Sequence, residues 1–97
     1  MPFTLIAYDH TDMNAYARRL EVREEHLEMA ETMRIDGKLL YAVALMDQFQ
    51  EKIIGSVMVF NLESKEEIDQ YLAEEVYVKN NVWDQIQVFP GKVAPGF

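Results

Sequence analysis

Two apolar segments separated by a short turn constrain the fold of this chain more than any other feature. Residues 38–46 and 53–62 carry apolar side chains at both odd and even positions, and residues 47–51 between them are mostly polar. Successive side chains on a strand point to opposite faces of a sheet, so strands of this kind need cover on both faces. Two strands joined by so short a turn most simply form an antiparallel hairpin. The sequence therefore predicts a hairpin at the centre of the chain that is buried on both sides.

The flanking segments predict a strand and a helix on each side of this hairpin. Thr11 or Asp12 is the expected N-cap of the first helix, Gly37 ends it, and Ser64 opens the second helix through the capping box Ser64-Lys65-Glu66-Glu67. Residues 75–79 fit a further helical turn. The predicted elements are a strand at 3–8, a helix at 13–36, strands at 38–46 and 53–62, a helix from 65, and a strand at 82–89.

The order βαββαβ predicts a ferredoxin-like α+β fold. Right-handed crossovers place both helices on one face of a four-stranded antiparallel sheet. In the last strand, alternation puts Ile86 and Val88 on one side and Trp83 and Phe89 on the other. The sheet face without helices then carries large apolar groups, which soluble proteins rarely leave wet. We therefore expect a homodimer that packs through the sheet faces.

Composition narrows the classes of function. The 97 residues form one domain, 1–97, with a net charge of −8 and no cysteine. A strongly acidic chain is unlike the basic domains that bind nucleic acid, so we expect no nucleic-acid partner. No apolar run approaches the ~20 residues of a membrane span, and no targeting segment is recognisable, so we expect a cytoplasmic protein without a membrane partner.

The long helix carries three basic side chains close together. Projected at the helical period, Met13, Leu20 and Leu27 fall in the middle of an apolar stripe, and the glutamates of the helix fall on the far side. Arg19, Arg23 and His26 line one border of this stripe. Such a cluster is either a site for a small anion or a set of partners for the protein's own carboxylates, and the pattern leaves both interpretations open.

Several segments resemble one family. They are Arg19-Leu20-x-x-Arg23-x-x-His26-Leu27, Asp9 at the end of the first strand, Gly55-Ser56 early in the third strand, and Glu75-Val76-Tyr77-Val78 in place of Asp-Pro-Tyr-Val. In order and spacing they are similar to the YCII-related (YciI-like) family over nearly the whole chain. The resemblance implies a dimeric α+β barrel of ferredoxin-like protomers. It also implies a cleft with a histidine and an aspartate, which correspond here to His26 and Asp9.

The members of that family with assigned chemistry act on small cyclic or aromatic compounds, including a dehydrochlorinase. This chain departs from the family pattern in having Ala42-Val43-Ala44 where many relatives have Ala-Gly-Pro, and in having Glu75-Val76 where they have Asp-Pro. Both departures alter the surroundings of a ligand, so a substrate shared with those relatives is not implied.

The expected site therefore has two kinds of residue. His26 and Asp9 are the candidate acid–base pair, since a carboxylate fixes the tautomer and basicity of an imidazole. Arg19, Arg23, Ser56 and Tyr77 are candidate substrate-binding residues, because guanidinium groups hold carboxylates and enolates. We expect no metal and no cofactor. Two functions remain: an isomerase or lyase-type enzyme acting on a small anionic or cyclic substrate, and a non-catalytic dimeric module that binds a metabolite or regulates a partner.

Overall fold

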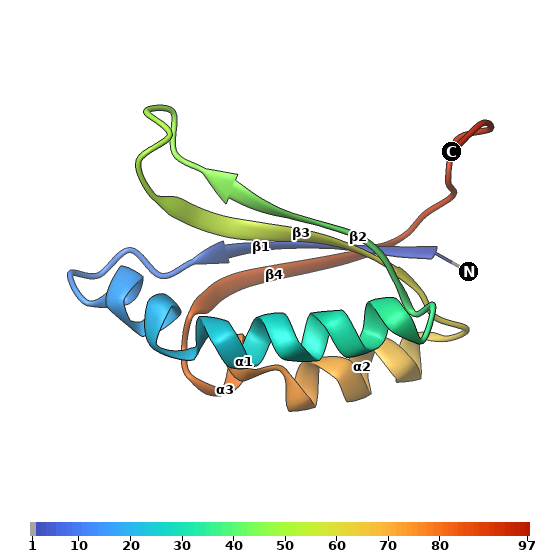
Figure 1. The fold of residues 1–97 in the computed structure, drawn as a ribbon, viewed down its shortest axis with the longest axis horizontal. Helices are drawn as coiled ribbons and strands as arrows, with labels where there is room; N and C mark the ends of the chain where they lie inside the picture. The colour runs from blue at the N-terminus through green and yellow to red at the C-terminus, as the bar shows by residue number, and fades with distance from the viewer. Residues whose placement is uncertain (1) are drawn as a thin grey trace.

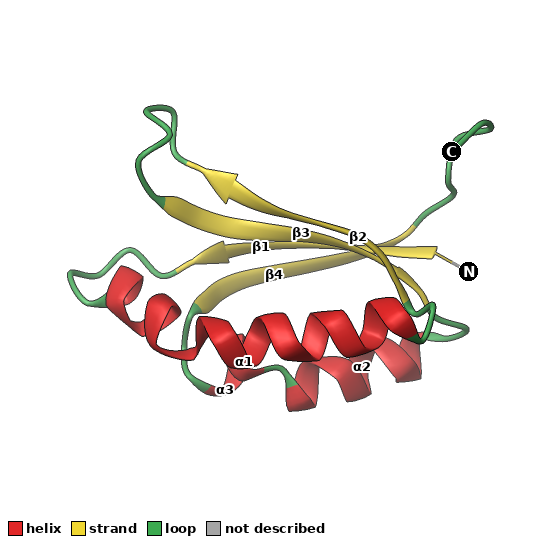
Figure 2. Ribbon diagram, in the orientation of Figure 1, coloured by secondary structure: helices red, strands yellow, loops and turns green. Residues whose placement is uncertain are grey.

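The computed structural model describes residues 2–97, which form a four-stranded antiparallel sheet with its helices on one face (Figures 1 and 2). The strand order is β2-β3-β1-β4, and adjacent strands are antiparallel. The elements are β1 (Pro2–Asp9), α1 (Ala15–Ile35), β2 (Leu39–Met46), β3 (Ile53–Asn61), α2 (Lys65–Glu74), α3 (Val76–Lys79) and β4 (Trp83–Pro90). The predicted ferredoxin-like order is confirmed, and α3 is the predicted additional helical turn.

The end of α1 and the start of α2 form as the sequence predicts, but the start of α1 does not. Gly37 closes α1 at a φ of 76°, a conformation that glycine adopts without a Cβ clash. The Ser64 side chain accepts a hydrogen bond from the Glu67 amide, as predicted. The predicted cap of α1 is wrong, because the N-cap is Asn14. Asp12 instead pairs with the Arg18 guanidinium through contacts of 2.7 and 2.8 Å.

The core lies between the sheet and the helices. Alternate residues of β1 and β3 point toward the helices, and those of β1 are Phe3, Leu5 and Ala7. Figure 1 shows α1, α2 and α3 together on this side of the sheet. The principal buried apolar side chains are Phe3, Leu5, Ala7, Leu39, Met58, Phe60, Leu62, Ile68, Tyr71, Tyr77, Val82 and Trp83.

The opposite face of the sheet carries no helix and is apolar, as predicted. Tyr41 is 67% exposed there, and Tyr8, Val43 and Phe89 are also exposed. The tail after β4 lies at one end of this face, where Val93 and Phe97 line a hollow together with Tyr41. Within residues 2–97 no other segment covers this face (Figure 2).

The buried face of α1 differs from the predicted apolar stripe. Ala15, Arg19 and His26 are its buried residues, whereas Leu20 and Leu27 are 50% and 45% exposed. The helix is thus rotated so that two basic residues expected at the border point into the protein. The predicted rotation is wrong because it followed apolar side chains only, and Arg19 and His26 are buried against carboxylates contributed by other elements.

Candidate functional site

A cavity of about 240 Å³ lies between α1 and the hairpin of β2 and β3. The hairpin bends away from α1 toward its turn (Figure 1), and the β2 side chains facing α1 are the small Ala42 and Ala44. The cavity is lined by Arg19, Arg23, His26, Leu27, Ala42, Val43, Ala44, Ile53, Ser56, Met58 and Tyr77. All five of the predicted site residues other than Asp9 therefore line one cavity.

Asp9 binds Arg19 rather than His26. Both Asp9 oxygens accept hydrogen bonds from Arg19 Nη1, at 2.9 and 3.0 Å, and both side chains are almost completely buried. Burial raises the pKa of Asp9, and the charge and hydrogen bonds of Arg19 oppose that rise. Arg19 Nη2 donates to the Ser56 hydroxyl at 3.1 Å. Asp9 thus fixes Arg19, and Arg19 links β1, α1 and β3 at the cavity wall.

A bulge in the sheet brings Trp83 to the same place. The register of β1 with β4 shifts between Tyr8 and Asp9, so that Asp9 pairs with Trp83. A shift of one residue moves a side chain to the other face of a sheet. The prediction that Trp83 shares a face with Phe89 is therefore wrong: Trp83 is buried on the helix side, and its indole N–H donates to the Ser56 hydroxyl at 3.3 Å.

His26 is paired with Glu75, the N-cap residue of α3. His26 Nδ1 lies 2.7 Å from Glu75 Oε1, and Glu75 is only 1% exposed. The same oxygen accepts the Tyr77 amide at 3.2 Å, and the Tyr71 hydroxyl donates to Oε2. Burial raises the pKa of Glu75, but the hydrogen bond and charge of His26 and the donors from Tyr71 and Tyr77 together hold that pKa below its ordinary value. Glu75 is therefore a carboxylate at neutral pH.

This carboxylate determines which nitrogen of His26 is available. A carboxylate acceptor favours the tautomer with its proton on Nδ1. No hydrogen-bond partner for Nε2 is found among residues 2–97, and Nε2 is not among the fully buried unpartnered atoms. Nε2 is thus the nitrogen of His26 that a ligand in the cavity can reach.

The Tyr77 ring fixes the spacing of the two basic groups. It stacks on the His26 ring with centroids 4.0 Å apart, and the Arg19 guanidinium carbon lies 4.7 Å from its centroid. Arg19 and His26 are two turns apart on α1, about 10 Å of rise, so a ring that contacts both lies between them. Burial raises the pKa of Tyr77, and the nearby charges of Arg19 and Arg23 oppose the rise.

Arg23 is the cationic side chain of the cavity that remains available. It is exposed, and within residues 2–97 it has no carboxylate partner at salt-bridge distance. Arg19, by contrast, donates to Asp9 and Ser56 through Nη1 and Nη2, and only its buried Nε has no hydrogen-bond partner within the described residues. Both interpretations of the basic cluster therefore apply, each to different residues. Arg19 and His26 are partners of the protein's own carboxylates, whereas Arg23 is free to bind an anion.

The predicted His26–Asp9 pair is replaced by two separate pairs, Arg19–Asp9 and His26–Glu75. The sequence contained one signal for Glu75, its place in a segment that resembles a family motif, but nothing local shows that α3 lies beside His26. Tyr71, whose hydroxyl donates to Glu75, was not among the predicted site residues. His10, the other histidine, lies 3.7 Å from Asp84 outside the cavity.

A family model describing a YCII-related domain matches residues 1–92. The chain belongs to the YCII-related family. Among curated proteins none matches its sequence. One similar solved structure is 5-chloro-2-hydroxyhydroquinone dehydrochlorinase from Burkholderia phenoliruptrix AC1100, in complex with 2,5-dihydroxybenzoquinone, with a TM-score of 0.82, 16% identity, and coverage of 97% of this chain and 96% of that one.

Two further structures share the fold at lower similarity. A dimeric ferredoxin-like protein from an uncultured marine organism has a TM-score of 0.52 and 18% identity, with coverage of 100% of this chain and 98% of that one. The cofactor-independent oxygenase SnoaB from Streptomyces nogalater has a TM-score of 0.51 and 9% identity, with coverage of 99% and 96%. At these identities the likeness concerns the fold, which in this YCII-related chain carries the cavity described above.

Residues 2–97 contain neither a membrane-spanning helix nor a cluster of side chains suited to a metal ion. None of the helices there has the length and apolar character needed to cross a membrane. Nor do three or more His, Asp or Glu side chains gather in that part of the chain in a way that suits a metal ion.

Proposed function

We propose that this YCII-related protein is an enzyme that transfers protons on a small cyclic or anionic substrate, with His26 as the acid–base group. The observation that carries the proposal is the buried Glu75 carboxylate on His26 Nδ1, with Nε2 left for the cavity. A histidine held in this way is suited to general acid–base catalysis. Glu75 takes the part that the sequence predicted for Asp9.

The reaction class follows from the groups available. Nε2 removes a proton from a C–H or O–H group of the substrate, and the imidazolium formed is stabilised by Glu75. Return of that proton to another atom of the resulting enolate gives an isomerisation. Expulsion of an anionic leaving group from the enolate gives an elimination, after which the imidazolium loses its proton to solvent. Both are isomerase or lyase-type reactions.

Three residues bind the substrate in this proposal. Arg23 neutralises an anionic oxygen, since its guanidinium has no carboxylate partner within the described residues. The Ser56 hydroxyl already accepts hydrogen bonds from Arg19 and Trp83, so its own proton is available to a ligand oxygen. Tyr77 supplies an aromatic wall. Asp9 acts through Arg19, as a positioning residue.

A second function uses the same cavity without catalysis. Arg23, Ser56 and the apolar wall suffice to bind a small anion, and a metabolite-binding or regulatory module needs nothing more. The unpaired Arg23 favours this function as much as it favours an enzyme. The two differ in what they require of His26, because a binding module tolerates replacement of His26 by glutamine.

Proton exchange on 2,5-dihydroxybenzoquinone, the ligand of the similar dehydrochlorinase, tests the proposal. The ring C–H protons of this compound exchange with solvent when one enol reverts to its keto form. In D₂O we expect the wild-type protein to accelerate loss of the ring-proton NMR signal. We expect His26→Gln to abolish that acceleration, and His10→Gln, the matched control, to retain it.

Each outcome separates the two functions. Binding of the quinone with equal exchange rates for wild type and His26→Gln supports the non-catalytic module. Acceleration that persists in His26→Gln and disappears in Asp9→Asn contradicts the assignment of His26 as the acid–base group. Saturating binding is followed in the same samples from chemical-shift changes of the Tyr77 ring protons, since Tyr77 lines the cavity in every variant.

We further propose that the protein is a homodimer joined through the open sheet face. The exposed apolar side chains Tyr8, Tyr41, Val43 and Phe89 support this arrangement, as does the dimeric ferredoxin-like protein of the same fold. Light scattering should give a mass of twice 11.3 kDa, and Val43→Glu should give the single mass. The cytoplasm remains our expected compartment.

A further inference from the structure

We propose that the groove beside the cavity binds an apolar chain of the same ligand whose polar head lies at His26. The inference rests on the proposed function and names a finer class of substrate, an amphiphilic ring compound. The groove has a volume of about 310 Å³ and is lined by Leu27, Ala30, Glu31, Arg34, Leu39, Leu40, Tyr41 and Ala42. Leu27 and Ala42 also line the cavity, so the two spaces are adjacent along α1.

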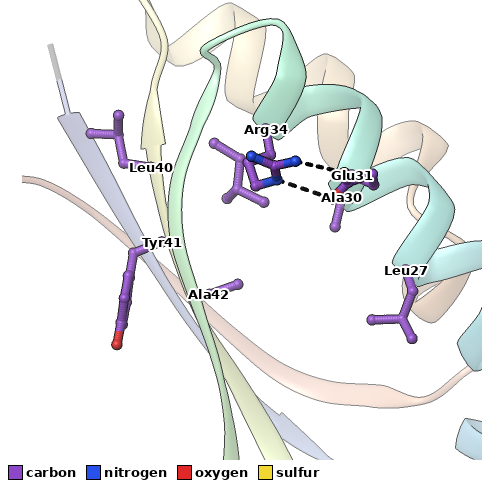
Figure 3. A pocket seen from close by; sticks show the side chains of 8 residues that line it. Leu27, Ala30, Glu31, Arg34, Leu40, Tyr41 and Ala42 are labelled. Carbon is purple, nitrogen blue, oxygen red and sulfur yellow. Dashed lines mark hydrogen bonds and ion pairs between the residues drawn. The ribbon is translucent and has the colours of Figure 1, made fainter.

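Small side chains create the groove. Figure 3 shows Leu27 and Ala30 of α1 facing Ala42 of β2 across an open space, while the Tyr41 side chain points to the far side of β2. The side chains at positions 30 and 42 are alanines on facing elements, and a larger residue at either position would fill the gap. Leu27 and Leu40 remain 45% and 47% exposed along this line, so the groove has an apolar wall in contact with solvent.

The chemistry of the walls selects an apolar occupant. Glu31 and Arg34 are the charged residues that line the groove, and they bind each other with contacts of 2.6 and 3.0 Å (Figure 3). Neither needs a ligand to satisfy its charge. In the adjoining cavity the situation is reversed, because Arg23 and His26 Nε2 are available. A ligand that matches both spaces has an anionic, ring-shaped head and a hydrocarbon chain.

The volumes of the cavity and the groove also support a ligand with its polar head in the cavity and its apolar chain in the groove. The cavity at His26, about 240 Å³, is smaller than the roughly 300–1,000 Å³ of most small-molecule sites. The groove, about 310 Å³, more than doubles the space. It extends along α1 from Leu27 to Arg34, two helical turns or about 10 Å.

A homologous series tests the inference. Affinities of the wild-type protein are measured by calorimetry for 2,5-dihydroxybenzoquinone and for its 3-propyl and 3-pentyl derivatives. Burial of one CH₂ group corresponds to about a fourfold gain in affinity, so binding should tighten with each added methylene. Ala30→Leu, which fills the groove, should remove this gain and leave the affinity for the parent quinone unchanged.

Two further variants keep the test decisive. Leu40→Ala removes an exposed wall residue and should reduce the gain per methylene, again without affecting the parent compound. Ala17→Leu makes the same change as Ala30→Leu on an exposed position of α1 and should behave as wild type.

The outcomes separate the groove from the proposed function. If the parent quinone binds and its alkyl derivatives bind no more tightly, or bind equally well to Ala30→Leu, the groove proposal is overturned and the proposed function stands. If the series binds with the expected gain but His26→Gln exchanges protons as fast as wild type, the groove stands and the enzyme proposal falls. If no member of the series binds, both proposals are overturned.

Discussion

The two buried carboxylates of the site, Asp9 and Glu75, are 8% and 1% exposed and differ in their hydrogen-bond donors. Asp9 is held by a single guanidinium, and burial raises its pKa. Glu75 accepts from His26, from the Tyr71 hydroxyl and from the Tyr77 amide, and its pKa is lowered although burial acts against it. Hydrogen bonds to the charged form therefore decide the pKa of a buried carboxylate as much as burial does.

The difference separates a fixed part of the site from a reactive one. Arg19 donates to Asp9 and to Ser56 and lies over the Tyr77 ring, so the Arg19–Asp9 pair serves to position Ser56 and the Tyr77 ring. His26 keeps Nε2 without a partner among residues 2–97, and its partner Glu75 is a carboxylate that accepts from three donors. The same helix thus presents one positioning guanidinium and one imidazole proposed for acid–base catalysis, two turns apart.

Breaking the fixed pair should have the largest effect on stability. Arg19→Met leaves Asp9 as a buried carboxylate without a counter-charge, which costs about 3–5 kcal/mol. Urea unfolding measures the loss. The double variant Asp9→Leu/Arg19→Met removes both charges and should be clearly more stable than Arg19→Met. A double variant as unstable as the single one would show that Asp9 is not the residue that Arg19 compensates.

Glu75→Gln should destabilise the protein less than Arg19→Met does, and it should lower the rate of proton exchange on the substrate more. Glutamine keeps an acceptor for His26 and Tyr77 but removes the charge, at a cost of about 1–3 kcal/mol for the altered buried hydrogen bonds. Proton exchange on 2,5-dihydroxybenzoquinone should fall to the rate of His26→Gln, whereas Asp9→Asn should retain measurable exchange. Equal losses in Glu75→Gln and Asp9→Asn would remove the distinction between the two pairs.

A fall in pH should change the contributions of Glu75 and Asp9 to folding stability in opposite directions. The pKa of Glu75 is lower in the folded protein than its ordinary value of 4.5, so the stability it contributes is present above pH 4.5 and is lost as the pH falls below it. The pKa of Asp9 is raised, so protonation of Asp9 favours the folded state. The stability difference between wild type and Glu75→Gln should therefore narrow below pH 4.5, and Arg19→Met should recover part of its loss. A constant difference from pH 7 to pH 3 would contradict the lowered pKa of Glu75.

The smallest change in stability is expected for Arg23→Gln. Arg23 is exposed and unpaired within residues 2–97, so the free energy of unfolding should stay within about 0.5 kcal/mol of wild type. Affinity for the hydroxyquinone should fall at least about tenfold, since a charged hydrogen bond contributes roughly 1.5–3 kcal/mol. Calorimetry compares it with Lys65→Gln, a cation on α2 outside the cavity. Unchanged affinity in Arg23→Gln would remove Arg23 from the site.

The features that sequence predicted well are local ones. The strand pattern, the glycine at position 37 and the cap at Ser64 depend on neighbouring residues, and the fold follows from the order of the elements. The N-cap at Asn14 was missed because Asp12 is an equally good cap by residue type, and its side chain is paired with Arg18.

The site was predicted in part, because its pairings join distant segments. An apolar stripe cannot show that Arg19 and His26 are buried, since each is buried only through a carboxylate 10 or 49 residues away. The bulge at Tyr8 and Asp9 turns Trp83 to the helix side, and strict alternation gives no sign of it. Five of the predicted site residues line the cavity, and the predicted pairing of His26 with Asp9 was wrong.

The most direct test of the His26–Glu75 pair is a long-range ¹H–¹⁵N NMR spectrum of the imidazole rings, with His10→Gln used for assignment. In the neutral form of His26 we predict a proton on Nδ1 and a bare Nε2, with the same spectrum in Asp9→Asn and a changed one in Glu75→Gln. A neutral His26 with its proton on Nε2, or a spectrum that responds to Asp9→Asn and not to Glu75→Gln, would contradict the assignment of Glu75 as the carboxylate that prepares His26 for proton transfer.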